Sequence, residues 1–188
     1  MTLKLCIAGV TGWTGSAIAR TVLERDGVEL VSAVARSSAG QDVGAALGLG
    51  RDTGVVISAS VDEALQARPD VFIDYTSATV VKDHALSAMK QGIPVIVGTS
   101  GLTRADFDDL DAAARADGVG IIGGGNFSMT AAMLQYLARI AARHLPHYEI
   151  LDFSWADKED VPSGTARELA ETLAAVRKPE YAKSPADF

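Results

Sequence analysis

Hydrophobic residues along this chain form short β-branched runs that alternate with longer stretches of helical composition. Such alternation is typical of a parallel β-sheet covered by helices. The runs predict strands over residues 3–8, 28–35, 55–58, 71–75, 95–97 and 119–122. The stretches between them predict helices over residues 14–25, 61–67, 78–91 and 104–117. The pattern therefore predicts an α/β fold built on a doubly wound parallel sheet.

The pattern changes at three consecutive glycines, residues 123–125, which favour a loop or a hinge. Beyond them we expect a helix over residues 128–144, one more strand over 148–155 and a helix over 167–176. One strand and two helices in about 60 residues make a thin core. We therefore expect two domains, residues 1–125 and 126–188, of which the second is cut short or completed by another subunit.

Composition narrows the class of function. The chain carries 17 Lys and Arg against 24 Asp and Glu, a formal net charge of −7. This charge argues against nonspecific nucleic-acid binding and against a polybasic membrane surface. The single cysteine, Cys6, cannot form an intrachain disulfide, and no apolar run approaches the ~18 residues of a membrane span. We expect a cytoplasmic protein that acts on a small molecule, with no nucleic-acid, membrane or metal partner.

The strongest motif is a glycine-rich turn between the first expected strand and the first expected helix. Its glycines allow a tight turn, close approach of backbone N–H groups to a pyrophosphate, and close packing of helix on strand. The helix N-terminus adds a favourable field for phosphate groups. A glycine-rich turn without a ligand is the alternative, but the strand–turn–helix setting favours a dinucleotide site. The residues of the turn are Gly9, Val10, Thr11, Gly12, Trp13, Thr14 and Gly15.

The end of the second expected strand bears on the choice of cofactor. NAD sites usually carry an Asp or Glu about twenty residues after the glycine turn. Here the chain has Arg36, Ser37 and Ser38 instead. A guanidinium and two hydroxyls suit a 2′-phosphate, although a solvated loop arginine is the alternative. The sequence thus predicts NADPH as the preferred cofactor, with NADH possible.

Two further loops follow expected strands at the edge where open α/β sheets bind ligands. Near the C-terminus, two hydroxyls and the N–H groups at a helix start make a small anion nest beside a lysine. By composition alone, a capped helix and a surface lysine would be the simpler interpretation. The residues concerned are Thr76 in one loop, Gly98, Thr99 and Ser100 in the other, and Lys158, Ser163 and Thr165 near the C-terminus.

Taken in this order, the segments resemble the dihydrodipicolinate reductase family, which reduces a cyclic dicarboxylate with a nicotinamide cofactor in lysine and diaminopimelate biosynthesis. The resemblance spans about residues 3–175, and its most specific motif is Lys-x-Asp-x-Pro-Ser-Gly-Thr at residues 158–165. The other matching segments are residues 9–15, 72–76, 97–101 and 126–128. The resemblance implies a Rossmann-type dinucleotide-binding domain followed by part of an α+β substrate and oligomerisation domain that builds a homotetramer.

The resemblance also implies roles for single residues. Lys158 would donate a proton, with Ser154 at a second catalytic position. The nicotinamide would be lined by Gly98, Thr99, Ser100, Gly124, Gly125, Asn126 and Phe127. A substrate carboxylate would be held by Ser163, Gly164 and Thr165, with Trp155 beside it.

The chain departs from the family's pattern at several positions. Ser154 and Trp155 stand where the family has a His-His pair, and Trp13 and Thr14 stand where it has Arg-Met. The family's glycine-rich C-terminal strands are absent after residue 188. The leading hypothesis is an NADPH-dependent reductase of the family's substrate. The missing imidazole donors leave open a divergent paralogue that reduces a different cyclic imine or enamine, and a third hypothesis is an NADP-binding sensor without turnover.

Overall fold

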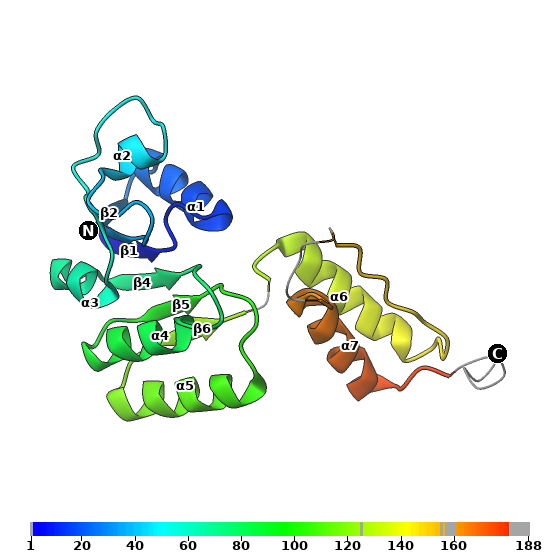
Figure 1. Cartoon of the computed structure of the whole chain (residues 1–188). Helices are drawn as coiled ribbons and strands as arrows, with labels where there is room; N and C mark the ends of the chain where they lie inside the picture. The colour runs from blue at the N-terminus through cyan, green and yellow to red at the C-terminus, as the bar shows by residue number, and fades with distance from the viewer. Residues whose placement is uncertain (1, 125, 155, 157–160, 181–188) are drawn as a thin grey trace. The chain divides into compact units, whose positions relative to one another are not determined.

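The computed structural model describes residues 2–124, 126–154, 156 and 161–180. The chain divides into two compact units, Met1–Gly124 and Gly125–Phe188 (Figure 1). No helix in the described part of the chain has both the length and the hydropathy needed to cross a membrane.

The first unit is built on one six-stranded parallel sheet of order β3-β2-β1-β4-β5-β6. This is the strand order of a Rossmann-type fold, and it confirms the predicted fold class. The order reverses between β1 and β4, so the loops that follow these two strands lead to opposite faces of the sheet; open α/β sheets bind their ligands at such a point. The strands are β1 (Leu3–Ala8), β2 (Val28–Val34), β3 (Ile57–Ser58), β4 (Val71–Asp74), β5 (Val95–Val97) and β6 (Ile121–Gly123).

Helices cover both faces of this sheet (Figure 1). Side chains alternate between the faces along each strand. Leu5 and Ile7 of β1 pack in the cluster that includes α1 and α2, whereas Cys6 and Ala8 pack with α3, α4 and α5. The helices are α1 (Trp13–Glu24), α2 (Val43–Ala46), α3 (Val61–Ala64) with the short 3-10 helix η1 (Leu65–Ala67), α4 (Val81–Lys90) and α5 (Arg104–Asp117).

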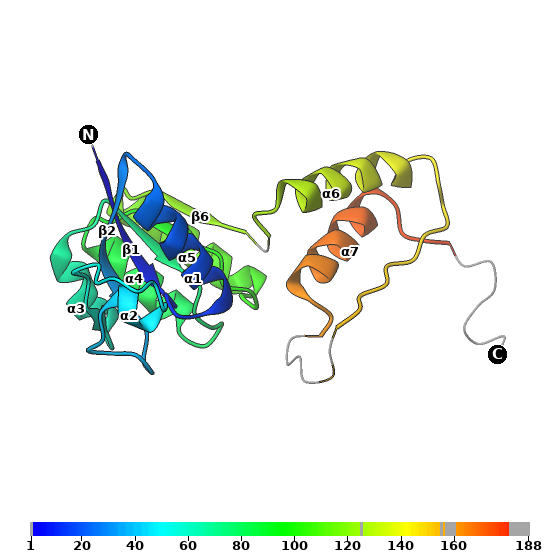
Figure 2. The same cartoon turned by 90° about the horizontal axis from the view of Figure 1, so that it is seen from above.

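The second unit contains two helices, α6 (Met129–Ala142) and α7 (Gly164–Val176), which pack against each other (Figure 2). The segment between them is tied to the chain after α7, because the Tyr148 hydroxyl donates to the Arg177 carbonyl at 2.7 Å. Among residues 126–154, 156 and 161–180, Ala142 and Leu173 are the only buried hydrophobic residues. The described part of this unit therefore has almost no core of its own.

The structure corrects two expectations, one about residues 148–155 in the second unit and one about the glycines that precede this unit. The strand predicted over residues 148–155 is wrong for residues 148–154, which form no regular element. A strand needs a hydrogen-bonded neighbour, and the described residues offer none here. Gly123 ends β6 instead of belonging to a loop, and the pairing continues because the Gly124 N–H donates to the Val97 carbonyl at 3.2 Å.

Helix α7 begins at Gly164 and not at residue 167 as predicted. Ser163 is its N-terminal cap, since the Ser163 Oγ accepts the N–H of Ala166 at 3.2 Å. The short α2 was absent from the sequence prediction. Asp42 caps it by accepting the N–H of Gly44 at 2.6 Å.

Candidate dinucleotide-binding site

The glycine turn after β1 brings three backbone segments into close contact. A Cβ on Gly9 would lie 2.2 Å from the carbonyl oxygen of Tyr75, and a Cβ on Gly15 would lie 2.1 Å from the carbonyl oxygen of Gly9. Gly9 also has a φ of +79°, which residues with a side chain rarely adopt. Neither position has room for a side chain. Both glycines are therefore required to bring the start of α1 against the loop after β4.

This turn leaves the N-terminus of α1 without a side-chain cap. Gly12 is the capping residue, its own N–H donates back to the Gly9 carbonyl at 2.9 Å, and the first turn of α1 has no acidic residue. The N–H groups of Trp13 and Thr14 come next, and the first N–H groups of a helix lack acceptors within it. Both residues are exposed to solvent, and 95% of the surface of Trp13 is accessible. An open, positively polarised helix end fits the pyrophosphate of a dinucleotide.

Two other predicted residues of the turn, Val10 and Thr11, are more buried than its helix end. Val10 is buried in the face covered by α1, and its N–H donates to the Val34 carbonyl of β2 at 3.2 Å. Thr11 is half-buried. The turn is thereby tied to β2 as well as to the loop after β4.

The loops after β4 and β5 also close against each other. The Gly98 N–H donates to the Asp74 carbonyl at 2.9 Å, and a Cβ on Gly98 would lie 2.0 Å from the Tyr75 ring. Partial burial raises the pKa of the Tyr75 hydroxyl. Thr76 is half-buried, Thr99 is buried and Ser100 is exposed. The structure thus brings the predicted Thr76, Gly98 and Thr99 together at the carboxyl ends of the strands, beside the glycine turn.

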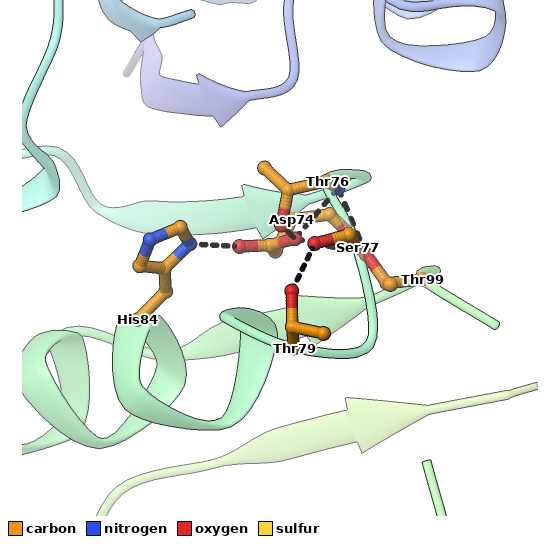
Figure 3. Close-up of polar contacts among 6 residues, drawn as sticks. All are labelled: Asp74, Thr76, Ser77, Thr79, His84 and Thr99. Atoms are coloured by element: carbon orange, nitrogen blue, oxygen red, sulfur yellow. Dashed lines mark hydrogen bonds and ion pairs between the residues drawn. The ribbon is translucent and has the colours of Figure 1, made fainter. Parts of the chain in front are cut away.

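A buried carboxylate joins these two loops (Figure 3). The Oδ1 of Asp74 accepts hydrogen bonds from the Thr76 N–H at 2.8 Å, the Thr76 hydroxyl at 2.6 Å and the Thr99 hydroxyl at 2.9 Å. Its Oδ2 lies 2.8 Å from the Nδ1 of His84 on α4. The sequence interpretation gave no role to Asp74 or His84. The available signal was a single acidic residue at the end of an otherwise apolar strand.

Arg36 lies exposed in the loop after β2, next to Ser37 and Ser38. The next carboxylate along the chain, Asp42, is held by internal hydrogen bonds. It accepts the N–H groups of Thr53 at 3.0 Å, Gly44 at 2.6 Å and Gly54 at 2.8 Å. These bonds, above all the one from Thr53, hold the pKa of Asp42 below its usual value. The loop therefore offers a guanidinium, and no free carboxylate, at the end of β2.

In the second unit, three predicted residues meet at the start of α7. Ser163 caps the helix, and its own N–H donates to the Asp152 Oδ2 at 2.7 Å. The Asn126 Nδ2 donates to the Thr165 Oγ1 at 3.3 Å. Asn126, predicted at the cofactor, and Thr165, predicted at the substrate, therefore lie side by side. Because Asp152 already takes the Ser163 N–H, an anion here would be left with the N–H groups of Gly164 and Thr165.

Three of the remaining predicted residues belong to the described part of the chain. Ser154 and Phe127 are exposed and Gly124 is half-buried. Gly125, Trp155 and Lys158 lie outside the described residues.

Two further kinds of chemistry, a reactive thiol and a metal centre, find no support among the described residues. Cys6 is buried within β1, and desolvation raises the pKa of its thiol to about 11, so the thiolate is scarce near neutral pH. In the described ranges, no three His, Cys, Asp or Glu side chains gather closely enough to hold a metal ion.

Comparison with known proteins identifies relatives over the whole chain. A family model described as the N-terminus of dihydrodipicolinate reductase matches residues 3–127. The 4-hydroxy-tetrahydrodipicolinate reductase of Moorella thermoacetica is 33% identical, over 99% of this chain and 70% of the relative. That of Geobacillus thermodenitrificans is 32% identical, over 94% of this chain and 67% of the relative. The chain thus spans about 70% of the length of the first of these relatives.

Solved structures give the same result. A dipicolinate-bound dihydrodipicolinate reductase from Paenisporosarcina sp. TG-14 superposes with a TM-score of 0.76 at 26% identity, over 98% of this chain and 70% of that one. An amine dehydrogenase from Mycobacterium smegmatis, 22% identical with a TM-score of 0.65, shares the fold. The predicted resemblance is confirmed: this chain belongs to the dihydrodipicolinate reductase family and is an NAD(P)H-dependent oxidoreductase.

Proposed function

We propose that this chain uses NADPH to reduce a cyclic imine or enamine that carries a carboxylate, of the 4-hydroxy-tetrahydrodipicolinate type for which its relatives are named. The observation that carries the proposal is the uncapped N-terminus of α1, held at the end of β1 by Gly9 and Gly15. It offers N–H groups and a positive helix end to a pyrophosphate, next to the loops after β4 and β5.

The preference for NADPH is supported at the end of β2. A 2′-phosphate carries negative charge, which the Arg36 guanidinium would meet with charge-assisted hydrogen bonds. NAD sites instead hold the ribose hydroxyls with a carboxylate. Asp42 is already bound by three backbone N–H groups and is not available for that role.

The chemistry requires one hydride and one proton. When bound, the reduced nicotinamide supplies the hydride, which adds to the carbon of a C=N or conjugated C=C bond. The electron pair of that bond then takes a proton at nitrogen or at the neighbouring carbon. The Lys158 ammonium is the proposed donor, because it has an exchangeable proton and a positive charge that would attract the substrate carboxylate. This role rests on the Lys-x-Asp-x-Pro-Ser-Gly-Thr motif.

The start of α7 would hold the substrate carboxylate. The N–H groups of Gly164 and Thr165 and the Thr165 hydroxyl are the candidates there, while Ser163 fixes the helix start. Ser154 and Trp155 stand where the family's histidine pair would add donors, so α7 and Lys158 would carry more of the binding.

The second unit would be completed by a second copy of the chain. Helix α6 has a single charged residue, Arg139, and exposes large hydrophobic side chains to solvent in the isolated chain. A helix that is apolar around most of its surface is normally buried. The exposed residues are Met129, Met133, Leu134, Tyr136, Leu137 and Ile140.

The cofactor preference is tested with Arg36→Ala. Loss of charged hydrogen bonds to the 2′-phosphate should weaken NADPH binding by about 1.5–3 kcal/mol and leave NADH binding nearly unchanged. Titration calorimetry with both cofactors measures the difference. Arg25→Ala, at the opposite end of α1, is the matched control and should change neither affinity. Equal losses for the two cofactors in Arg36→Ala would contradict the assignment.

The proton donor is tested with Lys158→Met, which keeps an unbranched side chain as far as Cε and removes the ammonium group. Turnover of 4-hydroxy-tetrahydrodipicolinate should fall by about 10²–10⁴-fold, the usual scale for a general acid, while NADPH affinity stays at the parental value. Lys178→Met, at an exposed lysine after α7, serves as the control. A Lys158→Met protein with the parental rate would remove this lysine from the mechanism.

Assembly is tested with Leu134→Glu on α6. A carboxylate buried at an interface costs several kcal/mol, whereas the same change on a solvent-facing side chain costs little. Light scattering at micromolar concentration should show an oligomer for the parent and a shift toward the monomer for the variant. Val56→Glu, at an exposed aliphatic residue of the first unit, should leave the mass unchanged. A parental protein that is monomeric would refute this part of the proposal.

A further inference from the structure

Asp74 is a fully buried carboxylate at the end of an apolar strand. Phe72, two residues earlier and therefore on the same face of β4, packs in the hydrophobic cluster beneath α4. Taking an ionised carboxylate out of water costs several kcal/mol, and a well-packed apolar residue often serves stability as well or better. Packing alone therefore does not account for an acid at this position.

The partners of Asp74 come from two different loops. Thr76 in the loop after β4 donates both its N–H and its hydroxyl to Oδ1, and Thr99 in the loop after β5 donates its hydroxyl to the same atom. The Thr99 Oγ1 also lies 2.9 Å from the Thr76 N–H, which it accepts. These contacts close a triangle between the carboxylate and the two threonines (Figure 3). The Oδ1 of Asp74 thus links the two loops, in addition to the bond from the Gly98 N–H to the Asp74 carbonyl.

His84 fixes the carboxylate in turn. Its Nδ1 lies 2.8 Å from Oδ2, so both carboxylate oxygens are held and rotation of the carboxylate is restrained. A carboxylate accepts hydrogen bonds when it is ionised, and the His84 tautomer with its hydrogen on Nδ1 is the one that can donate to it. Elsewhere in the described part of the chain, no lysine or arginine forms an ion pair with Asp74. His84 lies on α4, so a third element is joined to the two loops.

We propose that Asp74 and His84 are a positioning pair for the nicotinamide end of the cofactor site. The inference rests on the proposed function, which places Thr76, Gly98 and Thr99 at the cofactor. The pair itself touches no cofactor. It acts through Thr76 and Thr99, by setting the spacing of the two loops against which the nicotinamide ring would rest.

The sheet order limits this effect to one end of the cofactor. The loops after β4 and β5 lie on one side of β1, whereas Arg36 follows β2 on the other side. Disturbing the pair should therefore affect the nicotinamide end and spare the adenosine end. Hydride transfer is the sensitive step, because a displacement of about 1 Å can lower a rate by about 10²-fold.

The experiment compares whole cofactor with a fragment that lacks the nicotinamide. NADPH binding is followed by the fluorescence of its reduced nicotinamide, and 2′-phospho-ADP-ribose binding is followed by calorimetry. The variants are Asp74→Asn, which keeps one acceptor oxygen and removes the charge, and His84→Leu, which leaves Oδ2 without its partner. His84→Gln keeps an N–H donor and is the rescue variant. Thr79→Val is the control, since it removes the Ser77–Thr79 hydroxyl contact in the same loop without touching Asp74.

In His84→Leu and Asp74→Asn we expect kcat for hydride transfer to fall by about 10–100-fold and the nicotinamide fluorescence of bound NADPH to change. The fragment should bind both variants as it binds the parent. His84→Gln should recover most of the rate, and Thr79→Val should behave as the parent. His84 is partly exposed, with 24% of its side chain accessible, so His84→Leu decides the matter if Asp74→Asn fails to fold.

Two results would overturn the inference. One is a parental hydride-transfer rate in both variants, and the other is an equal loss of affinity for NADPH and for the fragment, which is the signature of general destabilisation. The proposed function is judged separately on the parental protein. If the parent binds neither NADPH nor NADH, the proposed function fails; if it binds and turns over but the variants show no such split, only the positioning pair fails.

Discussion

The carbonyl oxygen of Tyr75 lies only 2.2 Å from the position that a Cβ of Gly9 would occupy. This close approach is the constraint on which the arrangement of the first unit depends. It holds the turn after β1 against the loop after β4, across the point where the strand order reverses. Gly15 extends the constraint, because the start of α1 must pass within contact of the Gly9 carbonyl. A helix N-terminus and two strand ends are thereby gathered at one edge of the sheet, where open α/β sheets bind ligands.

The strands and helices of the first unit were largely predictable because local pattern and tertiary packing agree there. Strands β1 and β5 and helix α5 begin and end at the predicted residues, since short, largely apolar runs and capped helices carry their boundaries in the sequence. The strand predicted over residues 148–155 failed for a different reason. Alternation of apolar and polar residues marks a segment that could pair, but only a neighbouring strand makes it a strand.

The candidate site divides in the same way. The glycine turn, Thr76, Gly98 and Thr99 could be named in advance because the loops that follow parallel strands meet at the same edge of a sheet. The pairing of Asp74 with His84 depends on how α4 packs on the sheet, and no spacing rule gives that orientation. The link between Asn126 and Thr165 joins residues far apart in the chain, and only the fold of the second unit brings them together.

The central claim is that the closed glycine turn exists to receive a pyrophosphate, and Gly12→Ala tests it most directly. Gly12 has a φ of −72°, open to any residue, and an added Cβ would lie 3.1 Å from the Gly9 carbonyl oxygen and 4.0 Å from that of Tyr75. The account predicts a folded protein whose thermal midpoint falls by only a few degrees, because alanine is a poorer helix cap than glycine. The added methyl group would stand at the helix end to which the pyrophosphate is proposed to bind. Affinity for NADPH and for NADH should therefore fall by the same factor, about tenfold if one hydrogen bond to the phosphate is displaced. Parental affinity for both cofactors in this folded variant would contradict the account.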